Sequence, residues 1–114
     1  MTHTIERDEI KRLLDEGRPV TIVEALPEKY WKHSHLPGAL NLPHDSVREL
    51  APSLLPDRDA LIVVYCANEP CRNSTIASEE LQAMGYRNVR EYVGGKQDWV
   101  DAGLPVEKGV KALA

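Results

Sequence analysis

The chain has 114 residues, of which 42% are hydrophobic and 28% are charged, and its formal net charge is −4. This length predicts one domain, residues 1–114, and the apolar fraction is sufficient for a buried core. The acidic balance disfavours general nucleic-acid binding, which requires a clustered basic face.

Hydropathy and cysteine content predict the cellular context. The apolar runs are too short to cross a bilayer, and the polar start MTHTIERDE lacks the apolar core of a signal peptide. We therefore expect no membrane contact and a cytoplasmic location. Two cysteines in such a chain are better interpreted as reactive thiols than as a structural staple.

Short helical patterns alternate with β-branched and apolar runs. Gly17 and Gly85 end helical patterns, and Pro52 is expected to end another. In chain order we predict a helix at 10–14, a strand at 20–23, a helical turn at 28–32, a strand at 38–41, a helix at 44–50, a strand at 61–65, a helix at 74–84, a strand at 88–93 and a helix that opens at 94–95 and closes near 103.

This alternation predicts an α/β domain with a mainly parallel sheet. The continuous apolar strand at 61–65 is typical of a sheet covered on both faces. In such sheets ligands bind beyond the carboxyl ends of the strands, which is where Cys66 falls. The tail at 105–114 is expected to be partly mobile.

Cys66 is the leading candidate nucleophile because it lies between a buried strand and a helix start. The first backbone N–H groups of a helix have no partner within the helix, and the helix dipole is positive at that end. Both effects favour an anion, and therefore thiolate over thiol.

Four motifs occur in the order HLPGALNLP at 35–43, VVYC at 63–66, GYRNVREYVGGKQDW at 85–99 and AGLPV at 102–106. Together they resemble a single-domain rhodanese, with a core at about 5–107 and a tail at 108–114. The resemblance implies a three-layer fold with a five-stranded, mainly parallel sheet and helices on both faces.

The resemblance also implies sulfur transfer. Cys66 would take sulfane sulfur from a donor such as thiosulfate or polysulfide, hold it as a persulfide, and pass it to a thiol, a cyanide-like acceptor or a protein acceptor. Loop amides would stabilise the thiolate and persulfide. No metal or organic cofactor is needed. The implied anion-binding loop comprises Ala67, Asn68, Glu69, Pro70, Cys71, Arg72 and Asn73.

The chain departs from the common rhodanese pattern in two places. The loop is about two residues longer, so that Asn73 and Ser74 occupy the usual Arg-Ser positions, where one of them is expected to cap the helix. The usual acidic-x-Arg element after the first parallel strand becomes Glu24-Ala25-Leu26, so its structural Arg is missing.

Two alternatives to sulfur transfer remain open. Cys66, five residues and Arg72 have the spacing of the rhodanese-fold phosphatases and arsenate reductases, and a guanidinium suits a tetrahedral oxyanion. Against this alternative, Tyr65 replaces the usual His, and Asn73-Ser74 replaces Gly-Pro. The second alternative is a non-catalytic or redox regulatory module, in which Cys71 acts as a resolving thiol that forms a disulfide with Cys66.

Three histidines, His33, His35 and His44, fit no standard zinc spacing with the cysteines, so we predict no metal site. In the HLPGA stretch, the resemblance implies a structural role for His35. The Gly94-Gly95 pair lacks the surrounding pattern of a phosphate loop and is expected to permit a tight turn from strand to helix.

Overall fold

The strands form one parallel sheet with the order β1-β5-β4-β2-β3 in the computed structural model, which describes residues 3–69 and 71–109. The strands are β1 (His3–Thr4), β2 (Thr21–Glu24), β3 (Leu40–Asn41), β4 (Ile62–Tyr65) and β5 (Val89–Tyr92). The helices are α1 (Arg7–Asp15), α2 (Glu28–His33), α3 (Val47–Leu54), α4 (Asn73–Ala83) and α5 (Gly95–Asp101). The predicted α/β fold with a five-stranded parallel sheet is confirmed.

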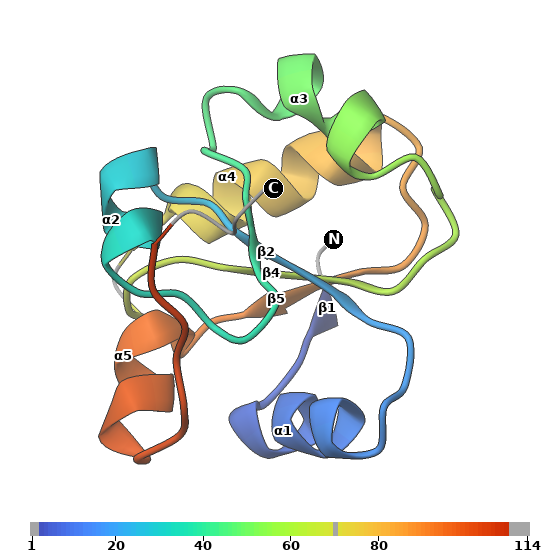
Figure 1. The fold of residues 1–114 in the computed structure, drawn as a ribbon. Helices are drawn as coiled ribbons and strands as arrows, with labels where there is room; N and C mark the ends of the chain where they lie inside the picture. Colours follow the sequence, from blue (N-terminus) through green and yellow to red (C-terminus); the bar gives the residue numbers. More distant parts are fainter. Residues whose placement is uncertain (1–2, 70, 110–114) are drawn as a thin grey trace.

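Helices cover both faces of the sheet (Figure 1). On one face, Ile62 and Val64 of β4 belong to a core cluster with residues of α3 and α4. On the other face, Val63 and Tyr65 belong to a second cluster, which includes Trp99 of α5 and a residue of α1. All residues of β4 are buried, as the continuous apolar pattern predicted.

The topology places the end of β4 between the ends of two neighbouring strands. Tyr65 of β4 pairs in register with Glu24 of β2, and Val64 pairs with Glu91 of β5. Cys66 follows β4 directly, so the loop after it starts between two carboxylate-bearing strands. This position is the carboxyl edge at which parallel sheets bind ligands.

Two elements differ from the sequence prediction. The α3 helix continues through Pro52, which was expected to end it. Proline lacks the N–H that would bond to the carbonyl of Arg48, but Arg48 is exposed, so water can satisfy that carbonyl. The short edge strand β1, which pairs with β5, was not predicted from the sequence.

The start of the C-terminal tail is tied to the domain. The backbone groups of His35 and Glu107 exchange hydrogen bonds of 2.9 and 2.8 Å, and the Trp99 indole donates to the Pro105 carbonyl at 2.7 Å. The rest of the tail, 110–114, lies outside the described residues. Within the described ranges, no helix is long and apolar enough to cross a membrane.

Candidate active site

Cys66 lies at the junction predicted from the sequence, between the end of β4 and the start of α4. The residue is only 1% exposed. Its sulfur lies 3.5 Å from the carbonyl oxygen of Cys71 and 3.4 Å from the hydroxyl of Ser74. The thiol position is therefore deep in the loop, against the first turn of the helix.

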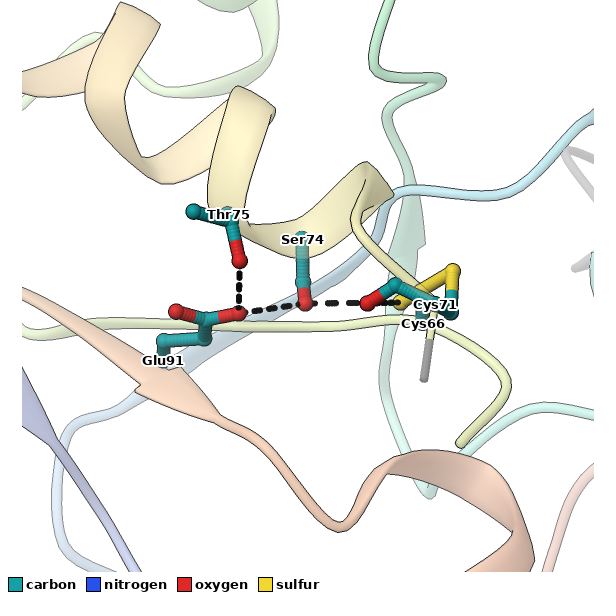
Figure 2. Close-up of a disulfide and its surroundings, with 5 residues drawn as sticks. All are labelled: Cys66, Cys71, Ser74, Thr75 and Glu91. Carbon is teal, nitrogen blue, oxygen red and sulfur yellow. Dashed lines mark hydrogen bonds between the residues drawn. A yellow bond between two sulfur atoms is a disulfide. The ribbon is translucent and has the colours of Figure 1, made fainter. Parts of the chain in front are cut away.

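Cys66 and Cys71 are joined by a disulfide (Figure 2). Their Cα atoms are 6.4 Å apart, within the range that a disulfide spans. The second cysteine of the loop therefore reaches the first. In this oxidised form Cys66 has no free thiol, and it must be reduced before it can act as a nucleophile.

The start of α5 is hydrogen-bonded to the first residues of the loop. The backbone N–H groups of Lys96 and Gln97 donate to the carbonyls of Cys66 and Ala67 at 2.9 and 2.8 Å. Gly95 has a φ of +69°, and a Cβ built on it would lie 2.7 Å from the Cys66 carbonyl oxygen. Only glycine accommodates this turn and this close approach, so the predicted role of the glycine pair is confirmed at Gly95.

The loop amides do not converge on the sulfur in this disulfide form. The N–H of Cys71 donates instead to the carbonyl of Asn68 at 3.1 Å. Within the described part of the chain, no backbone N–H donates to the Cys66 sulfur. A cradle of amides around a persulfide therefore requires the loop to rearrange when the disulfide is reduced.

The start of α4 carries no side-chain cap, contrary to the prediction for Asn73 or Ser74. The N-cap residue is Arg72, and the Ser74 hydroxyl donates to Glu91 Oε2 at 2.7 Å. Thr75 donates to the same oxygen at 2.8 Å. A buried carboxylate on β5 thus competes successfully for the hydroxyl that was expected to cap the helix (Figure 2).

On the opposite side of β4, Glu24 is fully buried in a polar network. The Tyr65 hydroxyl donates to Glu24 Oε1 at 2.6 Å, and the Lys96 ammonium lies 3.1 Å from the carboxylate. Burial raises the pKa of Glu24 above its usual value, although the Tyr65 hydrogen bond and the Lys96 charge oppose that shift. Burial and the adjacent Glu24 raise the pKa of Tyr65 well above its usual value.

Lys96 therefore provides the cation for Glu24. Glu24 belongs to the Glu24-Ala25-Leu26 segment, where the Arg of the common rhodanese pattern is missing. The ammonium comes from the start of α5, far along the chain from Glu24. The same residue supports the Cys66 carbonyl through its backbone N–H. The missing Arg at Leu26 was recognisable from the sequence, but the Lys96 cation was not, because it lies 72 residues along the chain from Glu24.

The remaining predicted loop residues line the surface. Asn68, Glu69 and Arg72 are exposed, and Arg72 has no ion-pair partner among the described residues. Ala67 and Asn73 are partly buried. Pro70 lies outside the described residues.

A cleft of about 310 Å³ opens beside the loop at Ala67. Its apolar walls include Leu26, Tyr30 and Val100, and the last two are about half exposed.

His35 stacks on Trp31 and is hydrogen-bonded to the Trp31 carbonyl, contacts that give this histidine a structural role. The described residues contain no cluster of three or more metal-ligating side chains.

The fold and the site define a class of protein: a parallel α/β domain with a cysteine at the carboxyl end of a central strand, facing a helix start. The family model described as "Rhodanese-like domain" matches residues 6–102. The chain belongs to this family.

Two curated proteins are similar to this chain over most of its length. The chain is 34% identical over 92% of its length to the HTH-type transcriptional regulator Rv0324 of Mycobacterium tuberculosis, but it spans only 45% of that protein. It is 37% identical to the thiosulfate sulfurtransferase PspE of Escherichia coli, with 74% of each chain covered. Among solved structures, the BH2092 protein from Bacillus halodurans matches with a TM-score of 0.87 at 22% identity, over 99% of this chain and 82% of that one, which shows the shared fold.

Proposed function

We propose that this protein is a sulfurtransferase that carries sulfane sulfur on Cys66 as a persulfide. The observation that carries the proposal is the position of Cys66, buried at the end of β4 and against the first turn of α4. The similarity to the E. coli thiosulfate sulfurtransferase supports a donor such as thiosulfate or polysulfide. Small thiols, cyanide-like nucleophiles and a protein thiol are the proposed acceptors.

The reaction has two displacements. The Cys66 thiolate attacks the outer sulfur of thiosulfate, the S–S bond of the donor breaks, and sulfite leaves with the bonding electrons. A nucleophilic acceptor then attacks the outer sulfur of the persulfide, and Cys66 leaves as thiolate. The positive end of the α4 dipole favours both sulfur anions.

The disulfide supports a second candidate function, redox regulation of the same thiol. If Cys71 attacks the inner sulfur of the Cys66 persulfide, hydrosulfide leaves and the observed disulfide forms. A thiol reductant then restores both cysteines. In this scheme Cys71 is a resolving thiol, which ends a sulfur-loaded state and protects Cys66 from over-oxidation.

The phosphatase or arsenate reductase alternative remains a prediction from the spacing of Cys66 and Arg72. Arg72 is exposed and has no ion-pair partner among the described residues, so it is available to an anion. An aryl phosphate assay tests this alternative: phosphate release that depends on both residues would favour it over sulfur transfer.

The decisive experiment for sulfur transfer starts from the fully reduced protein, freed of reductant. After incubation with thiosulfate, intact mass spectrometry should show a gain of one sulfur atom, which cyanide removes as thiocyanate. Cys66→Ser should lose the adduct. Cys71→Ser is the matched control and should keep the adduct longer, because it lacks the thiol that resolves it.

Two results would count against the proposals. If the reduced wild-type chain gains no sulfur from thiosulfate or polysulfide, the sulfurtransferase proposal is wrong. If Cys71→Ser loads sulfur but holds it no longer than the wild type, Cys71 is not a resolving thiol.

A further inference from the structure

Glu91 is a buried carboxylate that the sulfur-transfer reaction does not require. It lies on β5, is only 7% exposed, and its register partner is Val64, two residues before Cys66. Its Oε2 accepts hydrogen bonds from the hydroxyls of Ser74 and Thr75. No Lys, Arg or His of the described residues forms an ion pair with it.

Ser74 connects this carboxylate to the reactive sulfur (Figure 2). In the disulfide form its oxygen is 2.7 Å from Glu91 Oε2 and 3.4 Å from Cys66 Sγ. We infer the same contact after reduction, because Cys66 and Ser74 flank the part of the loop that rearranges. A hydroxyl has one proton, and the short contact with a carboxylate oxygen, which can only accept, assigns that proton to Glu91. The oxygen therefore offers a lone pair to the sulfur.

This polarity favours one form of the reduced cysteine. A neutral Cys66 thiol can donate its proton to the Ser74 oxygen, whereas a thiolate would face a lone pair instead of a donor. The charge of Glu91 also opposes a second anion nearby, and no cation of the described residues is paired with it. Both effects act against the helix dipole, which favours thiolate.

Glu91 can in principle act in the opposite way, by taking the cysteine proton through Ser74. The rate of Cys66 alkylation separates the two alternatives. Loss of a base would slow the reaction, whereas loss of an opposing charge would accelerate it.

We propose that Glu91 is a positioning residue that, through Ser74, holds reduced Cys66 in the neutral thiol form and so restrains its attack on the sulfur donor. This inference rests on the proposed role of Cys66 in sulfur transfer.

The segments that contact Cys66 carry other charged groups. These groups are paired with other residues or screened by solvent, so their effect on the ionisation of Cys66 is smaller than that of Glu91. Lys96 at the start of α5 is bound to Glu24, and Asp98 on the same helix is bound to Arg7. The loop residues Glu69 and Arg72 are exposed, so solvent screens their charges.

The test measures Cys66 ionisation directly, in Cys71→Ser protein so that Cys66 is the only thiol. The iodoacetamide reaction rate is followed from pH 5 to 10. Glu91→Gln is expected to shift the midpoint of the profile to lower pH and to raise the rate at pH 7 roughly tenfold. Glu79→Gln removes the same charge from an exposed position on α4 and should leave the profile unchanged.

A second pair of variants tests the role of Ser74. In Ser74→Ala protein the hydroxyl is already absent, so Glu91→Gln changes only the charge near Cys66. Its shift of the alkylation midpoint should therefore be smaller than in protein with Ser74. Should Glu91→Gln fail to fold, as judged by circular dichroism, Glu91→Met removes the charge with an apolar side chain of similar length and carries the same expectation.

An unchanged profile in the folded Glu91 variant, or a slower reaction as expected for loss of a base, would overturn the proposal. Alkylation reports ionisation whether or not the protein transfers sulfur. A failed thiosulfate assay with the expected alkylation shift would therefore reject the sulfurtransferase function and keep the Glu91 control of Cys66.

Discussion

Two buried carboxylates flank the central strand, and their surroundings differ. Glu24 on β2 is bound by a phenol and an ammonium on the α1 and α5 side of the sheet. Glu91 on β5 is bound by two hydroxyls of α4 on the other side. The charge of Glu24 has a cation partner, whereas that of Glu91 has none within the described chain.

The difference separates a supporting role from a controlling one. A buried carboxylate paired with a cation fixes geometry, and here the cation belongs to the residue whose backbone supports the Cys66 carbonyl. The negative charge of a buried carboxylate without a cation is not neutralised, so it acts on the groups around it. For Glu91 the neighbouring group is Ser74, which lies next to the reactive sulfur. The Glu91 and Ser74 variants proposed above test the side without a cation, and variants at Lys96, Gly95 and Glu24 test the side with one.

Removing the cation from the paired side should have the largest effect on stability. Lys96→Met leaves Glu24 fully buried without its counter-charge, and we expect a loss of about 4 kcal/mol in the free energy of unfolding. Urea denaturation at pH 7 measures this loss. The loss should shrink at acid pH, where a protonated Glu24 no longer needs a cation.

Lys108→Met is the matched control because Lys108 is exposed. Its expected change is within about 0.5 kcal/mol. An equally small change in Lys96→Met would mean that the ion pair contributes nothing, and that Glu24 tolerates burial without it.

Substitution of Gly95, which lies against the backbone of the Cys66 loop, should have the second largest effect on stability. Gly95→Ala places a Cβ against the Cys66 carbonyl in a left-handed backbone conformation, and we expect a loss of about 3 kcal/mol. Gly103→Ala has a similar φ of +76° but no atom within 4 Å of the added Cβ, so only the backbone cost of about 1 kcal/mol applies. Equal losses by thermal or urea unfolding would show that the close approach to the loop is unimportant.

The fold was largely predictable because the pattern that encodes it is local. The strand at 61–65 is apolar throughout, and the helix after it has regular apolar spacing, so both were found close to their observed bounds. The edge strand β1 was missed because His3 and Thr4 are exposed and its pairing with β5 is non-local. The end of α3 was misplaced because Pro52 costs only the hydrogen bond to the carbonyl of Arg48, an exposed residue where water can replace it.

The site was predictable only where chemistry and position coincide in one segment. Cys66 was found because a cysteine after an apolar strand is a local signal. Lys96 and Glu91 were missed because their partners lie on other elements. A signal for Glu91 does exist, since a carboxylate at an alternating buried position of a predicted strand needs an internal partner.

The smallest expected effect is a difference in pH dependence. Burial raises the pKa of Glu24 in the folded protein above the ordinary value of 4.5, so the folded state retains a proton that the unfolded chain has lost. The contribution to stability is therefore fully present below pH 4.5 and is lost as pH rises through the folded-state pKa.

Glu24→Gln removes that titration, so its free energy of unfolding should decline less with rising pH across this range. The difference in slope is at most about 1.4 kcal/mol per pH unit, the value for one proton. Glu28→Gln, at an exposed carboxylate, should keep the wild-type slope. Parallel curves for the wild type and Glu24→Gln would mean that Lys96 and Tyr65 fully offset the burial of Glu24.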